Sequence, residues 1–234
     1  MILFDFGGTL ARETENDFLR GWQGVFRAVK DPPAGASPAR AHELASRLWE
    51  YQAVCRRHGA ELHEWQQLRT VLGVLGLEEA LDLETAERLL MENASAAQPV
   101  PYAGELLDFL HRQGIRTGVV SNIGWSGNGL AHRLKQILPE NRFEFVIASS
   151  EYGIRKPDPL LFQAALKKAG LPASQVWYCG DDLQADMVGA HGAGLFPVWF
   201  GGRGPGPDFP HLRVGDWREL AELLEKTVEE GERC

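Results

Sequence analysis

The pattern of apolar and polar positions divides the chain into a first strand, a helical block, and a region where strands and helices alternate. The apolar run 2–4 leads into Asp5 and then into two glycines. This order is typical of a buried parallel strand that ends in a tight turn. Ligands of open α/β sheets bind at the carboxyl ends of the strands, so Asp5 lies where we expect chemistry. Taken alone, Asp before Gly-Gly is also ordinary turn chemistry.

Residues 12–98 have the 3.6-residue periodicity of helices and predict an inserted unit of four helices. The first runs from about Phe18 to the break at 32–35, and the second begins after the N-cap Ser37. The third covers about 65–75, and the fourth is capped by Asp82. Four such helices can pack on one another as a small bundle. We expect its buried positions to include the stripe Leu44, Leu48, Tyr51 and Cys55 and the aromatic residues Trp22, Trp49 and Trp65.

From residue 99 onward strands alternate with helices, which predicts a mostly parallel, doubly wound α/β sheet with right-handed crossovers. The expected strands cover 115–120, 145–148, 176–179 and 196–200. The segment 99–101 is the expected linker back from the helical block. The predicted domains are therefore a Rossmann-like core of residues 1–11 and 99–234, and a helical insert of residues 12–98.

Composition narrows the classes of function. The chain has 234 residues, 44% of them hydrophobic, and a net charge of −8, which argues against a nucleic-acid surface. Its three cysteines show no Cys-x-x-Cys spacing, and no apolar run is long enough for a membrane span. Because the first strand starts at Ile2, we expect no signal peptide. We therefore expect a cytoplasmic protein, a monomer or homodimer, that binds neither nucleic acid nor membranes.

Polar residues follow the predicted strands at the points where the strands end. They are a hydroxyl, an ammonium group and several carboxylates: Asp5, Ser121, Lys156, Asp181 and Asp186. Each has a local alternative, because turns and helix N-termini also select Ser and Asp. Together, however, they are expected along one edge of a parallel sheet. Carboxylates at such short distances raise one another's pKa unless a cation lies among them. Mg²⁺ is a hard cation that prefers oxygen ligands such as these.

These residues resemble the four motifs of the haloacid dehalogenase-like hydrolases, most of which are magnesium-dependent phosphatases. The motifs appear in order as Phe4-Asp5-Phe6-Gly7-Gly8-Thr9-Leu10, Val120-Ser121-Asn122, Gly153-Ile154-Arg155-Lys156-Pro157-Asp158-Pro159 and Gly180-Asp181-Asp182-Leu183-Gln184-Ala185-Asp186. The resemblance implies that Asp5 is the nucleophile of an aspartyl-phosphate mechanism, assisted by Lys156. It implies a phosphate site formed by Gly8, Thr9, Ser121, Asn122 and Lys156, and a magnesium site formed by Asp5, Gly7, Asp181 and Asp186. It also implies that residues 12–98 form the family's mobile cap.

One position departs from the family's phosphatases. They usually carry a second Asp two residues after the nucleophile as general acid and base, and here that position is Gly7. Gly7 can still offer Mg²⁺ its backbone carbonyl, but it cannot move a proton, and loss of a general acid or base typically lowers rates about 10²–10⁴-fold.

Three alternatives follow from this departure. A metal-free dehalogenase also lacks the Asp, but Asp181, Asp182 and Asp186 without a metal would repel a carboxylate substrate. A phosphonate hydrolase would need a cap lysine, and Lys30 is the only lysine in residues 12–98. A weakly active or inactive protein could keep the fold to bind a phosphometabolite or a protein partner.

The expected substrate is a small phosphorylated metabolite. Residues 12–98 show no evident cluster of Arg or Lys that could bind a second phosphate. We therefore expect a single phosphoryl group on the substrate.

Overall fold

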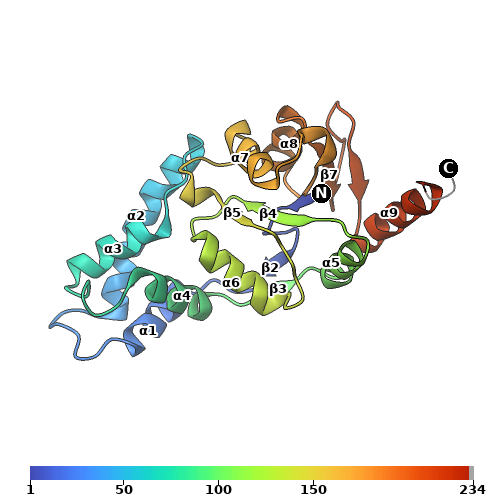
Figure 1. Ribbon diagram of the computed structural model, residues 1–234. Helices are drawn as coiled ribbons and strands as arrows, with labels where there is room; N and C mark the ends of the chain where they lie inside the picture. Colours follow the sequence, from blue (N-terminus) through green and yellow to red (C-terminus); the bar gives the residue numbers. More distant parts are fainter. Residues whose placement is uncertain (232–234) are drawn as a thin grey trace.

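The computed structural model describes residues 1–231, and the side chains of residues 1–226 (Figure 1). Six strands pair in parallel in the order β5-β4-β1-β6-β7-β8. These strands are β1 (Ile2–Phe4), β4 (Thr117–Ser121), β5 (Val146–Ala148), β6 (Trp177–Gly180), β7 (Phe196–Phe200) and β8 (Leu212–Val214). The predicted parallel α/β sheet is confirmed. The short strand β8 was not expected from the sequence, where residues before Asp216 carry little strand pattern.

Helices cover both faces of this sheet. The described residues form α1 (Phe18–Arg27), α2 (Pro38–Arg57), α3 (Glu64–Val74), α4 (Leu83–Ala94), α5 (Ala103–Arg112), α6 (Gly127–Ile137), α7 (Pro159–Ala169), α8 (Gly189–Gly192) and α9 (Trp217–Gly231). Short 3₁₀ turns cover 149–151 and 173–175, and a π-helix covers Leu183–Val188. None of these helices is long and apolar enough to cross a bilayer.

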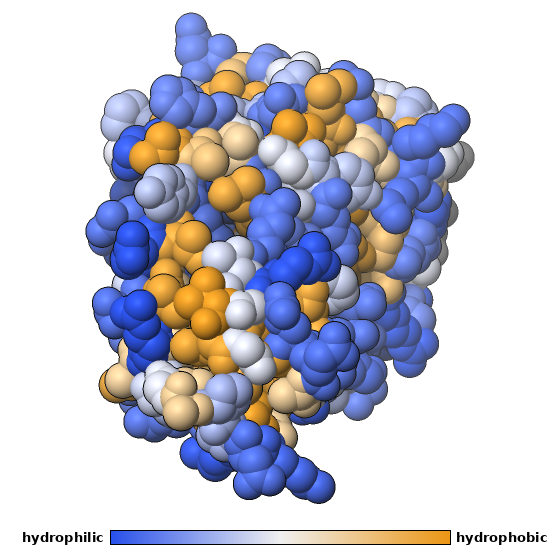
Figure 2. Space-filling model, turned by 90° about the vertical axis from the view of Figure 1, so that its left-hand side faces the viewer, coloured by the Kyte–Doolittle hydropathy of each residue, from blue (hydrophilic) through white to orange (hydrophobic). Residues whose placement is uncertain are grey.

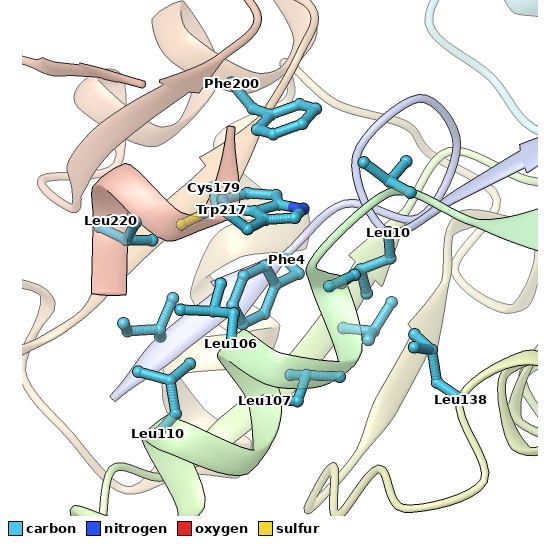
Figure 3. Close-up of a cluster of buried hydrophobic side chains, with 14 of the residues drawn as sticks. Phe4, Leu10, Leu106, Leu107, Leu110, Leu138, Cys179, Phe200, Trp217 and Leu220 are labelled. Atoms are coloured by element: carbon cyan, nitrogen blue, oxygen red, sulfur yellow. The ribbon is translucent and has the colours of Figure 1, made fainter. Parts of the chain in front are cut away.

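The core between the sheet and α5, α6 and α9 is built around aromatic rings (Figure 3). Trp217 stacks on Phe200 with ring centroids 4.2 Å apart and meets Phe4 edge-on at 5.7 Å. Its indole N–H donates to the backbone carbonyl of Thr9 over 3.1 Å, so the buried polar atom of Trp217 is satisfied. The final helix thereby holds the loop that follows Asp5. A second cluster packs α7 and α8 on the opposite face of the sheet.

Helices α1 to α4, residues 18–94, form a separate helical unit with its own buried cluster around Trp22 and Leu68. It lies to one side of the sheet in Figure 1, and its outer face in Figure 2 carries apolar patches among hydrophilic residues. The predicted N-caps are confirmed: the side chain of Ser37 accepts from the N–H of Arg40, and that of Asp82 accepts from the N–H of Thr85.

The two connections to the helical unit pair with each other. Strand β2 (Ala11–Glu13) runs antiparallel to β3 (Ala97–Pro99), with Ala11 opposite Pro99. The sequence predicted a linker here rather than a strand pair, because three-residue strands carry almost no periodicity and Pro is a weak strand former. The expected domain boundaries, between 11 and 12 and between 98 and 99, fall within this pair.

The structure corrects the expected buried face of α2. Tyr51 is 67% exposed and Trp49 is 45% exposed, so neither lies in the bundle core. The fully buried residues of α2 are Ala41, Ala45 and Gln52, while Leu44 and Leu48 of the predicted stripe pack against the core partly buried. The buried stripe is rotated from the predicted one because small residues let helices approach closely, whereas a hydropathy pattern follows the large side chains.

Candidate active site

Sheet order brings the predicted residues to one edge. Strand β1 lies between β4 and β6, so Asp5 after β1, Ser121 at the end of β4 and Asp181 after β6 end up on neighbouring strands. All three line one cavity of about 630 Å³. Lys156 lines it too and comes from the loop that precedes α7.

Asn122 fixes the backbone of Lys156. Its side-chain amide donates to the Lys156 carbonyl over 2.9 Å, and its Oδ1 accepts from the Lys156 N–H over 2.7 Å. The second and third motifs are thus joined by a pair of hydrogen bonds across 34 residues of chain. Asn122 also lines the cavity, and Ser121, 2% exposed, lines it with a hydroxyl that has no partner among the described residues.

The ammonium group of Lys156 lies at the centre of the site. Its Nζ donates to Asp5 Oδ1 over 2.7 Å, to Asp186 Oδ1 over 2.6 Å and to the hydroxyl of Tyr178 over 2.6 Å. Burial alone would lower the pKa of Lys156, but the carboxylates of Asp186 and Asp5 raise it above its ordinary value. Lys156 therefore stays charged and holds one oxygen of each carboxylate.

Tyr178 belongs to this network, although the sequence predicted it only as part of a strand. Its hydroxyl donates to the carbonyl of Val120 over 2.7 Å and lies 3.3 Å from Asp186 Oδ1. Burial and the nearby carboxylates raise the pKa of Tyr178 well above its ordinary value, so it remains a neutral phenol. The available signal was a Tyr in an otherwise buried strand, which needs a polar partner for its hydroxyl.

The side chains of Asp186 and Asp182 accept hydrogen bonds from backbone N–H groups at the start of the π-helix. Asp186 Oδ2 accepts from the N–H of Asp182 over 3.0 Å. Asp182 Oδ1 caps the helix by accepting from the N–H groups of Gln184 and Ala185. The sequence left the role of Asp182 open, and the structure shows that it is a helix cap at the edge of the cavity.

Thr9 occupies a different place from the one expected for a substrate ligand. Its hydroxyl is fully buried, donates to Asp181 Oδ1 over 3.2 Å, and does not line the cavity. Gly7 and Gly8 do line the cavity. The geometry therefore makes Thr9 a support for Asp181.

The carboxylates form a compact oxygen cluster that suits a hard divalent cation. One oxygen from each of Asp5, Asp181 and Asp186 lies within 4.8 Å of the others. Burial raises the pKa of Asp186 to about 6 although Lys156 opposes the shift, and burial with the charge of Asp186 raises the pKa of Asp181. Lys156 pairs with Asp5 and Asp186, so Asp181 has no cationic partner among the described residues. An oxygen-liganded cation such as Mg²⁺ would relieve this repulsion.

The helical unit and the residues leading into it form the other wall of the cavity. Glu13, Asn16, Phe18, Trp49, Arg56, Glu61 and Glu64 line it. The rings of Phe18 and Trp49 lie 6.2 Å apart, and the guanidinium group of Arg56 lies 4.3 Å from the centre of the Trp49 ring. The sequence had placed Trp49 in the bundle core, whereas the structure places it at the cavity.

Solved structures share this fold over nearly the whole chain. A haloacid dehalogenase-like phosphatase from Thermococcus onnurineus matches with a TM-score of 0.59 and 18% identity, covering 96% of this chain and 97% of that one. A 2-haloacid dehalogenase from Pseudomonas syringae pv. Tomato matches with a TM-score of 0.58 and 24% identity, covering 96% and 97%. At this identity the similarity shows the fold alone.

Sequence comparison identifies the family. A phosphoserine phosphatase from Thermus thermophilus is 43% identical over 104 residues, which cover 42% of this chain and 38% of that protein. The matches span between 38% and 53% of the length of the first three curated relatives. The family model of haloacid dehalogenase-like hydrolases matches residues 1–194. The chain therefore belongs to the haloacid dehalogenase-like hydrolases.

Proposed function

We propose that this chain is a magnesium-dependent phosphatase that acts on a small phosphorylated metabolite through an aspartyl-phosphate at Asp5. The observation that carries the proposal is the state of the Asp5 carboxylate. Its Oδ1 is held by Lys156 at 2.7 Å, while its Oδ2 has no partner among the described residues and the residue lines the cavity. One oxygen is thus fixed, and the other is available to attack phosphorus.

The reaction has two steps. Asp5 Oδ2 attacks phosphorus, the bond from phosphorus to the leaving oxygen breaks, and that oxygen takes the electron pair. Water then attacks phosphorus, and the bond from phosphorus to Asp5 Oδ2 breaks with its electron pair returning to the Asp5 carboxylate. Inorganic phosphate leaves with the oxygen of the water, whose released proton passes to solvent. Lys156 lies beside Asp5 with its three N–H groups directed at Asp5, Asp186 and Tyr178, so it would bind a phosphoryl oxygen by exchanging one of these partners. The unpartnered hydroxyl of Ser121 would bind another phosphoryl oxygen.

Asp5, Asp181, Asp186 and the carbonyl of Gly7 would hold Mg²⁺. The carbonyl of Gly7 accepts no hydrogen bond among the described residues, which leaves it available as a ligand. When bound, the cation neutralises the carboxylates and the incoming phosphoryl group, so that two anions can approach each other.

The helical unit is proposed to act as the cap. It contributes one wall of the cavity from residues 18–94, and a two-stranded connection joins it to the sheet. Closure of such a unit would exclude water from the phosphoryl group and select the remainder of the substrate. Lys30 is exposed and does not line the cavity, so the chain offers no cap lysine for phosphonate chemistry.

A metal-free dehalogenase fits this site less well. One oxygen from each of the three carboxylates lies within 4.8 Å of the others, and among the described residues Lys156 is the cation paired with two of them, Asp5 and Asp186. A haloacid substrate would add a further carboxylate. The phosphatase proposal instead supplies a divalent cation where the negative charge gathers.

The test is hydrolysis of 4-nitrophenyl phosphate and acetyl phosphate with Mg²⁺, compared with the same assay in a chelator. We expect turnover that requires Mg²⁺ and that Asp5→Asn abolishes. Asp108→Asn is the matched control, because Asp108 is an exposed residue of α5 outside this cavity. A folded protein that neither releases phosphate nor forms a phosphoenzyme would favour the alternative of a phosphometabolite-binding protein.

A further inference from the structure

Two arginines from distant parts of the chain meet on one buried carboxylate at the cavity wall. Glu61 is 2% exposed, and its Oε1 accepts from Arg56 Nε over 2.8 Å while its Oε2 accepts from Arg155 Nη1 over 2.8 Å. The hydroxyl of Ser149 donates to the same Oε2 over 3.2 Å. Glu61 therefore fixes one guanidinium group from the helical unit and one from the core.

Both guanidinium groups keep donors that no described residue uses. Arg56 donates from Nε to Glu61 and from Nη2 to Gln52, and Arg155 donates from Nη1 alone. Among the described residues, Nη1 of Arg56 and both Nε and Nη2 of Arg155 have no partner. The side chains are 23% and 24% exposed, and both line the cavity that contains Asp5. Paired, partly exposed guanidinium groups with free donors suit a planar anion.

The position of Arg56 is fixed before any ligand arrives. Its guanidinium group lies 4.3 Å from the centre of the Trp49 ring on one side and is bound by Glu61. Arg155 is the residue before Lys156, which binds Asp5, so Arg155 is joined directly to the proposed phosphoryl site. Glu61 binds both arginines and so holds Arg56 beside Arg155. Preorganised donors lose little freedom on binding, which favours affinity.

The net charge of the two arginines and Glu61 favours a monoanion over a dianion as the ligand. Two arginines and one Glu61 carboxylate leave a charge of about +1, which matches a carboxylate better than a phosphate dianion. Glu64 is the other carboxyl group near Arg56, and burial raises its pKa to about 7, so it cancels only part of this charge at neutral pH. The sequence showed no cationic cluster within residues 12–98, because the second arginine comes from the core.

We propose that Arg56 and Arg155 form a subsite that binds a carboxylate of the phosphorylated substrate while its phosphoryl group lies at Asp5. The substrate class is then a small phosphorylated carboxylic acid. This assignment rests on the proposed phosphatase function, of which it specifies the substrate.

The test compares two ligands that differ in one group, phosphoglycolate and ethyl phosphate, as competitive inhibitors of 4-nitrophenyl phosphate hydrolysis. We expect phosphoglycolate to bind about 10- to 100-fold more tightly, the range of charge-assisted hydrogen bonds. In Arg56→Gln and Arg155→Gln, the ratio of the inhibition constant of ethyl phosphate to that of phosphoglycolate should fall toward one. Glu61 keeps one arginine and Ser149 in either variant, so its buried charge is not left alone.

Arg57→Gln is the matched control. Arg57 is the exposed next residue of α2, lies outside the cavity, and has no partner among the described residues, so its variant should keep the ratio of the wild type. If Arg56→Gln weakens both ligands equally, the arginine merely joins the helical unit to the core and the proposal is wrong. A preference for a bisphosphate over phosphoglycolate would also overturn it.

The outcome for the subsite is separable from the outcome for the phosphatase. Calorimetric titration of Asp5→Asn with the same two ligands and Mg²⁺ needs no turnover. Wild-type hydrolysis without any preference for phosphoglycolate would reject the subsite and leave the phosphatase standing. A preference in the titration without any hydrolysis by the wild type would reject the phosphatase and support a binding protein with this subsite.

Discussion

Gly7 and Gly8 follow Asp5 and Phe6 in the same turn, yet their surroundings differ. A Cβ built on Gly7 would meet no atom within 4 Å, and Gly7 does not adopt a positive φ. Gly8 has a φ of 77°, and a Cβ there would lie 2.3 Å from Asp181 Oδ2. Only Gly8 therefore needs to be glycine, because of its positive φ and because Asp181 lies where a Cβ would be. The absence of a side chain at Gly7 is a chemical feature of the site rather than a steric necessity.

Gly7→Asp should accordingly fold and supply the missing proton donor. We expect hydrolysis of alkyl phosphates to rise about 10-fold or more, part of the usual effect of a general acid, because the surrounding residues do not hold the new carboxyl group. 4-Nitrophenyl phosphate should gain less, since its leaving group needs no proton. The ratio of kcat/KM for ethyl phosphate to that for 4-nitrophenyl phosphate measures this. An unchanged ratio in a folded, magnesium-binding variant would show that Gly7 does not limit the reaction.

Gly8→Ala, in contrast to Gly7→Asp, should impair both folding and Mg²⁺ binding. The left-handed backbone strains a residue with a Cβ by about 1–2 kcal/mol, and the methyl group would displace the carboxylate of Asp181. We expect lower stability in urea and a smaller stabilisation by Mg²⁺. Equal stability of Gly8→Ala and the wild type, with and without Mg²⁺, would contradict this account of the turn.

Helices α1 and α4 approach closely because α1 carries glycine at the contact. A Cβ on Gly21 would lie 2.9 Å from the Leu90 carbonyl oxygen, the Leu90 Cδ1 atom and the Ala94 Cβ atom. Glycine inside a helix is itself unfavourable by about 1 kcal/mol relative to Ala. The close contact explains why an otherwise poor helix former occupies this position.

Gly21→Ala should therefore destabilise the protein by about 1–3 kcal/mol despite the better helix propensity of Ala. The matched control is Gly104→Ala in α5, where the nearest atom to a built Cβ is Leu138 Cδ2 at 3.8 Å. That change should be neutral or stabilise by up to about 1 kcal/mol. Urea denaturation of both variants measures the difference, and an equal response of the two would show that the α1–α4 contact is not tight.

Elements with long-range periodicity or strong caps were predictable from the sequence. Strand β7 agrees with the expected strand at 196–200, and the expected N-caps Ser37 and Asp82 begin α2 and α4. Strands β2, β3 and β8, of three residues each, were missed because their pairing partners rather than their own residues define them. The exposed side of α2 was misassigned because Ala and Gln occupy its buried face.

At the scale of the whole molecule, the four motifs converge as their order along the sheet predicted, and contacts between distant segments supply the rest. Tyr178 joins Lys156 across 22 residues, and Arg155 joins Glu61 across 94. No local pattern signals such pairs, because each residue alone is an ordinary strand or surface residue. The residues of the proposed phosphoryl site were therefore predictable, whereas the proposed second subsite required the folded chain.

Magnesium should stabilise the whole core, because the folded state gathers carboxylates that the unfolded chain separates. At a concentration 100 times Kd, a ligand specific for the folded state adds about 2.7 kcal/mol, which a thermal melt detects as a higher Tm. Asp181→Ala should abolish the shift. This variant is cleaner than one at Asp186, since Asp181 has no contact with Lys156. Asp108→Ala should keep the shift in Tm. Equal melting temperatures of the wild type in Mg²⁺ and in chelator would show that the site binds no Mg²⁺.

The pH dependence of stability should report the buried Glu64 of the helical unit. Burial raises its pKa from 4.5 to about 7 in the folded protein, so the folded state binds this proton more tightly than the unfolded chain. Glu64 therefore lowers stability above pH 7, and the penalty disappears as pH falls from about 7 to about 4.5. Glu64→Gln should raise the free energy of unfolding at pH 8 by roughly 3 kcal/mol and change it little at pH 4.5.

Urea denaturation at pH 4.5 and pH 8, in a chelator, measures this difference without metal binding at the carboxylate cluster. Asp186, whose pKa is also raised, is present in every variant and so drops out of the comparison. Glu79→Gln is the matched control, because Glu79 is exposed and has no partner among the described residues. It should follow the wild type at both pH values. If Glu64→Gln also follows the wild type, the carboxyl group of Glu64 is solvated in solution, and the charge of the Arg56–Arg155 subsite is lower than its geometry indicates.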